Sequence, residues 1–211
     1  MSAAWRELHL PVARIPRDSV PSDTVRLARF LLGKVLVRQV AGAPVAGRIV
    51  ETEAYLPGDP ACHAFRGMTP RNRSLFLEHG HSYVYLCYGT SFMLNVSSEA
   101  AGIGAGVLLR ALEPLYGIEQ MQRNSKGVKP GDLLRGPGRL AAALKVDRRH
   151  DGLNLFSAEE LWIGSDGQAG SRIARSVRIG LSKAADKRLR YFIAGSPHLS
   201  GARRLNSPAR T

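Results

Sequence analysis

The sequence has 211 residues, with 30 Lys and Arg against 17 Asp and Glu, so its formal net charge is +13 at pH 7. A chain of this length suits one domain and buries roughly 70% of the surface that its unfolded form exposes, so folding requires neither a disulfide nor a metal. The 44% hydrophobic content argues against wholesale disorder, and no apolar run approaches the ~20 residues of a membrane-spanning helix.

The first part of the chain predicts one helix, two strands and a loop. Ser22 or Asp23 can cap the helix at its start, and Gly33 suits the position just after its end. In chain order, the expected elements are a helix over 24–32, a strand over 34–40, a turn at 42–44, a strand over 45–55 and a loop over 57–74.

The remainder of the chain predicts mostly strands. Strands are expected over 82–89 and 91–98, joined by a turn at Tyr88, Gly89 and Thr90, and over 106–114. A short helix carrying Leu115, Ile118 and Met121 should follow, and then a polar loop over 123–132. The last expected elements are a helix beginning at Pro137 and strands over 174–179 and 190–193. Many strands, few helices and no regular βαβ alternation indicate a single α+β domain. Its sheet should be curved and mainly antiparallel, with a protruding β-hairpin.

Two carboxylates stand out on the second predicted strand. Glu51 and Glu53 are two residues apart, so they share one face of the strand with Tyr55. The intervening residues are expected to point toward packed core: Val50, Thr52 and Ala54. In a partly desolvated cleft, one carboxylate could act as a general base. Spacing alone favours a solvated acidic face paired with arginines, and it does not choose between Glu51 and Glu53.

Aromatic residues are concentrated in the predicted hairpin. Tyr83, Tyr85 and Tyr88 are half of the six tyrosines in the chain, and Tyr88 lies at the turn. Such rings can stack on bases, and a ring at a hairpin tip can insert into a base step. Ordinary strand composition explains each tyrosine taken singly.

Other polar residues allow several interpretations. His63 lies in the punctuated loop, but its surroundings match no established zinc spacing, so no metal is expected. Arg71 and Arg73 can contact phosphate or pair with nearby acids. Cys62 and Cys87 form no CxxC pair; we expect small buried or half-buried thiols in a reducing cytoplasm.

The positive charge is uneven along the chain. From Arg172 to the end there are ten Lys and Arg and a single acid, Asp186. Such an excess favours a polyanionic partner, most commonly nucleic acid, although a solvated basic surface is the simpler alternative.

Several long segments, in order, resemble the alkyladenine (3-methyladenine) DNA glycosylase family of bacterial type. They are RIVETEAY (48–55), DPACHAFRGMTPRNRSLF (59–76), YVYLCYGTSFMLNVSS (83–98), VLLRALEP (107–114) and GPGRLAAAL (136–144). The resemblance runs from about Thr24 to about Ser200 within one domain, 1–211, and we expect residues 1–17 and 202–211 to be flexible ends.

The resemblance implies a monofunctional DNA glycosylase of base excision repair. Such an enzyme flips an alkylated or deaminated purine out of duplex DNA, hydrolyses its N-glycosidic bond and leaves an abasic site. Glu53 matches the general base that activates water, and Arg110 matches a residue near that water. No metal or organic cofactor is implied.

Further matches concern the base and the duplex. Tyr55, His63 and Tyr85 match residues that hold the flipped base. Asn95 matches a residue that excludes guanine, and Tyr88 matches the ring that enters the minor groove. The implied partner is double-stranded DNA containing a damaged purine. We expect a monomer, located in the cytoplasm in association with the nucleoid.

Three positions depart from the family pattern. Thr90 and Ser91 differ beside the hairpin turn, where they could loosen support for Tyr88, and His198 replaces an apolar residue. Two other functions remain open: a protein that binds lesions without cutting, and a hydrolase that acts on free nucleotides.

Overall fold

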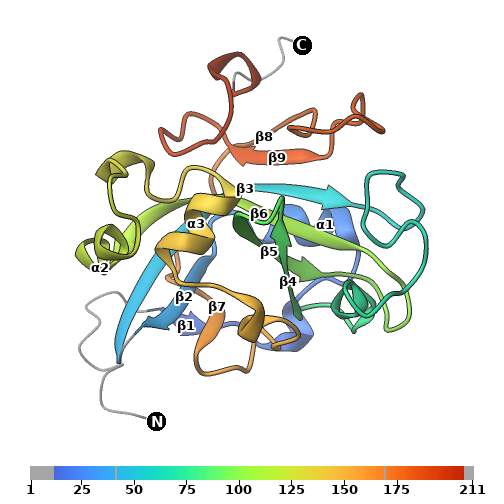
Figure 1. Ribbon diagram of the computed structural model, residues 1–211, viewed down its shortest axis with the longest axis horizontal. Coiled ribbons are helices and arrows are strands. Elements are labelled where there is room, and N and C mark those ends of the chain that lie inside the picture. The colour runs from blue at the N-terminus through green and yellow to red at the C-terminus, as the bar shows by residue number, and fades with distance from the viewer. Residues whose placement is uncertain (1–11, 41, 169, 207–211) are drawn as a thin grey trace.

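The computed structural model describes residues 12–40, 42–168 and 170–206. In this part of the chain, nine strands form one open sheet, and three short helices pack against it (Figure 1). Every pairing between its strands is antiparallel. The prediction of a single α+β domain with a mainly antiparallel sheet is therefore confirmed.

The strands are β1 (Ala13–Arg14), β2 (Val35–Val40), β3 (Ala43–Tyr55), β4 (Ser82–Cys87), β5 (Ser91–Ser97), β6 (Gly106–Tyr116), β7 (Leu161–Ser165), β8 (Ile173–Ser176) and β9 (Arg190–Ile193). The helices are α1 (Thr24–Phe30), α2 (Ile118–Asn124) and α3 (Pro137–Ala143). The main strand order is β1-β7-β2-β3-β6-β5-β4, with β9 joined to β3 and β8 joined to β9.

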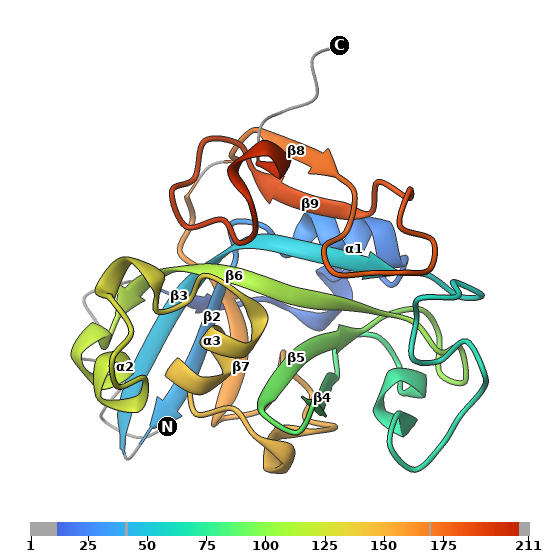
Figure 2. The ribbon, with the colours of Figure 1, turned by 45° about the horizontal axis from the view of Figure 1, so that its top comes forward.

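The long strand β3 organises the sheet. Along one edge it pairs with β6, and along the other it pairs first with β2 and then with β9 (Figure 2). At Glu53 the neighbours are Leu108 of β6 and Arg190 of β9. The acidic part of β3 therefore has a strand on each side, which pairs its backbone, and the side chains of Glu51 and Glu53 are fully buried.

A register shift between Ile49 and Glu51 places the acidic residues on their face of β3. The pairing of Ile49 with Leu112 is followed by that of Glu51 with Ala111, so Val50 is an extra residue on β3. A bulge of this kind reverses the alternation of faces. Ile49 before the bulge and Ala54 after it consequently both join the main core, although they are five positions apart.

The predicted orientation is right for Thr52 and Ala54 but wrong for Val50. The Thr52 hydroxyl donates to the Ala28 carbonyl of α1 at 2.9 Å, on the core side of the strand. Val50 instead packs in a separate cluster with Phe192 and Leu199. The bulge is the reason, because it breaks the strict two-residue period on which the prediction rested.

Local signals predicted most element ends. Asp23 caps α1 by accepting the Arg26 backbone N–H at 2.7 Å, and α3 begins at Pro137 as expected.

The helix predicted to carry Leu115 is wrong at its start, because β6 continues through Tyr116. Gly117 then adopts a left-handed φ of 71°, and a Cβ there would lie 2.8 Å from the Pro44 carbonyl oxygen. Neither β1 nor β7 was predicted from the sequence.

The β4–β5 hairpin carries Tyr88 at its tip, where the side chain is 95% exposed. The Thr90 N–H donates to the Cys87 carbonyl at 3.0 Å and closes the turn, and the two central residues, Tyr88 and Gly89, have φ values of 49° and 70°. Positive φ at both positions is the pattern of a type I′ turn. Thr90 therefore closes the turn through its backbone.

The predicted flexible ends fall largely on 1–11 and 207–211, outside the described residues, and stay a prediction. In the described portions of these segments, β1 pairs with β7, and a 3₁₀ turn spans Arg203–Leu205. None of the described helices has the length and apolar content that crossing a bilayer requires.

Candidate active site

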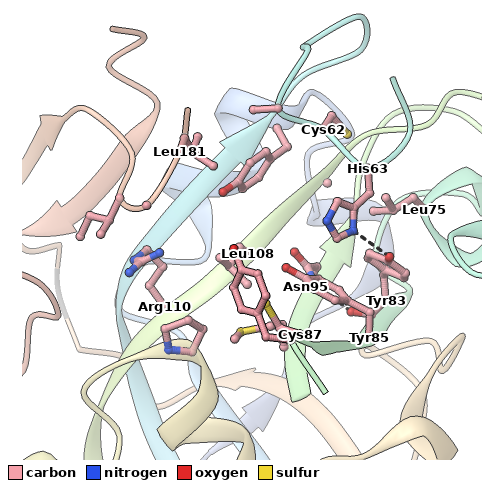
Figure 3. A pocket seen from close by; sticks show the side chains of 18 residues that line it. Cys62, His63, Leu75, Tyr83, Tyr85, Cys87, Asn95, Leu108, Arg110 and Leu181 are labelled. Carbon is pink, nitrogen blue, oxygen red and sulfur yellow. Dashed lines mark hydrogen bonds between the residues drawn. The ribbon is translucent and has the colours of Figure 1, made fainter. Parts of the chain in front are cut away.

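A cavity of about 350 Å³ opens between the β4–β5 hairpin, β6, the loop over 57–72 and the segment 179–181 (Figure 3). This volume is at the small end of the ~300–1,000 Å³ that is usual for small-molecule sites. Six of the predicted site residues line it: Tyr55, His63, Tyr85, Tyr88, Asn95 and Arg110. The fold therefore brings together residues that are up to 55 positions apart in the chain.

Aromatic rings form one wall of this pocket. Tyr83 and Tyr85 stack with centroids 5.2 Å apart, and His63 meets Tyr85 edge-on at 4.4 Å. His63 Nδ1 shares a 2.9 Å hydrogen bond with the Tyr83 hydroxyl, as Figure 3 shows, and Asn95 Nδ2 donates to the Tyr83 carbonyl at 3.1 Å. Tyr83, which the sequence analysis took singly as structural, thus holds two pocket residues in place.

The Glu53 carboxylate is fully buried behind the pocket wall. Of the described residues, three donate to it: the Tyr55 hydroxyl to Oε2 at 2.9 Å, Arg110 Nη1 to Oε2 at 3.2 Å, and the Ile179 N–H to Oε1 at 2.8 Å. Each of these three residues also lines the cavity. Glu53 is therefore connected to the pocket through all of its partners.

The Glu51 carboxylate is equally buried but differently bound. Oε1 accepts from Arg190 Nε at 2.6 Å, the Ser200 hydroxyl at 2.8 Å and Arg110 Nε at 3.1 Å, and Oε2 accepts the Ser200 N–H at 2.6 Å. Of the residues that donate to Glu51, only Arg110 lines the pocket, because Arg190 and Ser200 lie outside its lining. The two carboxylates therefore differ in their access to the pocket.

The expected solvated acidic face is therefore wrong, although its pairing with arginines is right. Two carboxylates, Glu51 and Glu53, share two guanidiniums, Arg110 and Arg190, and all four groups lie in the interior. Burying an isolated charge is very costly, so paired charges of opposite sign are the arrangement that an interior tolerates.

Neighbouring charges also shift the protonation of the site. Burial by itself lowers the pKa of Arg110. The Glu53 and Glu51 carboxylates together raise the pKa by more than burial lowers it, so the net pKa lies above the usual value. Burial and then the Glu53 carboxylate raise the pKa of Tyr55, and burial chiefly raises the pKa of Tyr85 to about 12. Arg110 therefore remains a cation and both tyrosines remain neutral near pH 7.

Two arginines of the basic C-terminal region are not surface residues. Arg190 is fully buried, and Arg178 is 3% exposed and pairs with Asp59 at 2.6 Å. The sequence analysis counted both within the surface charge excess. No local pattern distinguishes them from exposed arginines, because their carboxylate partners lie over 100 residues earlier in the chain.

Arg71 and Arg73 lie beside the hairpin instead of in the pocket lining. Arg71 Nη2 donates to the Leu86 carbonyl at 3.2 Å, and its guanidinium lies 5.9 Å from the Tyr85 ring centroid. Arg73 is exposed on the 3₁₀ turn over Arg73–Phe76. Of the three departures from the family pattern, Ser91 packs closely on Gly138 at the start of α3.

Both cysteines line the pocket as free thiols, Cys62 buried and Cys87 half-buried, which matches the expected environments. Across the residues that the structure describes, no three His, Cys, Asp or Glu side chains are grouped so that they could hold a metal ion.

The chain is similar to one known protein family over most of its length. The family model described as methylpurine-DNA glycosylase matches residues 18–197. A relative from Mesorhizobium japonicum is 58% identical over 199 residues, which cover 94% of each chain, and another from Paraburkholderia phytofirmans is 48% identical over 95% of this chain and 94% of its own. Both are named as 3-methyladenine DNA glycosylases.

The buried pair of Arg190 and Glu51 generates a stability prediction. Replacing Arg190 with Met leaves the Glu51 charge buried with less compensation, so we expect a loss of about 3–5 kcal/mol in the free energy of unfolding. Urea denaturation followed by circular dichroism measures it. The matched control is Arg123→Met, which removes an exposed pair with Glu119 and should cost less than ~0.5 kcal/mol. Equal effects of the two substitutions would contradict the assignment.

The environment of His63 generates a pH prediction. Burial, followed by the charge of Arg71, lowers the pKa of His63 below 6.5. Below pH 6.5 the unfolded chain therefore takes up this proton before the folded one does, so protonation of His63 reduces stability on the acid side. An NMR titration of the ring nitrogens should give a value under 6.5, and Arg71→Met should raise it part of the way. A value at or above 6.5 in the unmodified protein would refute this.

Proposed function

The chain belongs to the methylpurine-DNA glycosylase family, whose members are DNA repair enzymes that hydrolyse N-glycosyl bonds, and on this premise we propose a specific reaction. The enzyme flips an alkylated or deaminated purine out of duplex DNA into the tyrosine-walled pocket. Glu53 then activates the water that replaces the base at the sugar carbon. We further propose that it acts on DNA as a monomer in the cytoplasm.

The hydrogen bonding of the two carboxylates is the observation that carries the proposal. All three donors to Glu53, namely Tyr55, Arg110 and Ile179, line the pocket, whereas Glu51 also accepts from Arg190 and Ser200, which do not line it. Oε1 of Glu53 accepts only the Ile179 N–H, so it keeps a lone pair for a water that enters from the pocket. This difference favours Glu53 as the base and assigns Glu51 to the support of Arg110.

The chemistry follows from charge. Departure of a purine leaves positive charge on the sugar, and a carboxylate nearby both stabilises that charge and accepts a proton from water. Arg110, held as a cation between Glu51 and Glu53, binds Oε2 of Glu53 and so fixes the carboxylate that accepts the proton. The neutral tyrosines add no negative charge that would compete for the proton.

The aromatic wall suits the base itself. A purine between Tyr55 and the rings of His63 and Tyr85 gains stacking energy, and a methylated purine that carries positive charge gains cation–π attraction of ~0.5–2 kcal/mol per ring. A neutral His63 supports this, because a protonated imidazole would repel such a base. The side chain of Asn95, bonded to the Tyr83 carbonyl, would then limit which purine edges fit.

The hairpin suits the duplex. Tyr88 is almost fully exposed beside the pocket mouth, so its ring can occupy the space that the flipped base vacates. Arg71, which donates to Leu86 of the hairpin, and the exposed Arg73 are candidates for phosphate contact.

The direct test is base release from methylated duplex DNA and from a duplex containing one hypoxanthine, with enzyme in excess and no divalent metal. Free purine together with an unbroken, alkali-labile strand is the expected result. Tight binding without release would support a lesion-binding protein instead, and faster cleavage of free nucleosides than of duplex would support a nucleotide hydrolase.

For Glu53→Gln, we expect single-turnover base release to fall by about 10²–10⁴-fold, because the amide cannot accept the proton from water. Binding of the lesion duplex, measured by fluorescence anisotropy, should persist. Glu119→Gln, an exposed substitution of the same type on α2, should leave the rate unchanged. Full activity of Glu53→Gln would remove Glu53 from its role.

For Tyr88→Asn, we expect opposite effects on stability and activity. Asn tolerates the left-handed backbone at this position better than Tyr, so the free energy of unfolding should rise by up to ~1 kcal/mol. Loss of the ring removes roughly 1–3 kcal/mol of stacking, so base release should slow by about 5- to 150-fold. Thermal melts and single-turnover rates measure the two effects. An unchanged rate would argue against insertion of this ring.

A further inference from the structure

A separate buried ion pair lies beside the Glu53 network. The side chains of Arg178 and Asp59 are both fully buried, and Arg178 Nη1 lies 2.6 Å from Asp59 Oδ2. Neither residue lines the pocket, and the proposed reaction assigns no step to either. Their location still connects them to it, because Arg178 immediately precedes Ile179, which donates to Glu53.

Arg178 joins three segments that build the pocket wall. Its Nη1 also donates to the Ala54 carbonyl at the end of β3 at 3.0 Å, and its Nη2 donates to the Ala184 carbonyl at 3.4 Å. Asp59, its ionic partner, begins the loop that leads to His63 and accepts the Ala61 N–H at 3.0 Å. One guanidinium therefore ties the end of β3, the start of this loop and the segment 178–184 together.

The same guanidinium covers the Tyr55 ring at 4.6 Å from its centroid. Arg178 is buried and does not line the pocket, so this contact supports Tyr55 from within the protein interior. Tyr55 in turn donates its hydroxyl to Glu53 Oε2. Arg178 thus contacts Tyr55, which donates to Oε2 of Glu53, and immediately precedes Ile179, which donates to Oε1.

We infer that Arg178 is a positioning residue for base excision, which orients the Glu53 carboxylate by holding the Tyr55 hydroxyl and the Ile179 N–H. The inference rests on the proposed function. Arg178 does not touch the purine or the water. It acts through the geometry of the two donors, each of which fixes one carboxylate oxygen.

The choice of arginine at this position supports the inference. Arg178 Nε is buried and finds no hydrogen-bond partner among the described residues, a cost that a lysine paired with Asp59 would avoid. What arginine adds is a planar group that covers an aromatic ring while its nitrogens bond in several directions. These are the contacts that place Tyr55 and the segment 178–184.

The test compares Arg178→Met with Arg48→Met. Like Arg178, Arg48 is a buried arginine that pairs with a carboxylate, here Asp166 at 2.6 and 3.1 Å. Arg48 lies on β3 and is not part of the pocket lining. Arg178→Met should slow single-turnover base release by about 10- to 100-fold, the effect of misplacing a reacting group by roughly 1 Å. Affinity for the lesion duplex should change little, because phosphate contacts dominate it.

Arg48→Met should lower the melting temperature comparably and leave the rate unchanged. Arg178→Lys, which retains the charge and the fold, should give a rate between those of Arg178→Met and the unmodified protein. The inference is overturned if Arg178→Met releases base at the normal rate, if Arg48→Met slows release as much, or if Arg178→Lys is no faster than Arg178→Met.

Hydrogen exchange separates this inference from the proposed function. The Ile179 amide should exchange faster in Arg178→Met than in Arg48→Met, because its bond to Glu53 is loosened. This readout needs no activity. Failure of the unmodified protein to release base would reject the proposed function, whereas unchanged Ile179 exchange would reject the positioning role.

Discussion

The architecture depends on neutralising two carboxylates buried in the middle of a sheet. Glu51 and Glu53 lie on β3 between β6 and β9, where an uncompensated charge would be very unfavourable. Each neighbouring strand supplies one guanidinium, Arg110 from β6 and Arg190 from β9. Strand pairing and charge pairing therefore require each other, and the Ser200 N–H and hydroxyl extend the same requirement to the chain after β9.

A single extra residue decides which side of β3 the acids occupy. Without the bulge at Val50, Glu51 would lie on the same face as Ile49, whose side chain is part of the main core. The bulge turns Glu51 toward the arginines and leaves Thr52 and Ala54 facing the core. Apolar packing on one face and ionic pairing on the other are thus compatible on one strand, which explains how the Glu53 carboxylate can be rigidly held.

Interactions between near neighbours were predictable from sequence, and those between distant segments were not. The Asp23 cap, Pro137 at a helix start and the turn after Cys87 depend on residues within a few positions, so composition indicates them. The end of β6 was misjudged, because its last residues pair with the start of β3, which a local helical spacing at Leu115 does not reveal. The burial of Arg178 could not be predicted either, because its partner, Asp59, lies far away in the sequence.

The sequence by itself determined the α+β class, the hairpin with Tyr88 at its tip, and the resemblance that led to a purine glycosylase. Strand spacing did not distinguish Glu51 from Glu53, since both share a strand, a face and a residue type, and only the resemblance favoured Glu53. The tertiary structure gives the two carboxylates different surroundings, because the donors to Glu53 line the pocket, whereas Arg190 and Ser200, which donate to Glu51, do not. Which donors reach each carboxylate depends on how distant segments meet in space, and strand spacing carries no information about residues more than 50 positions away.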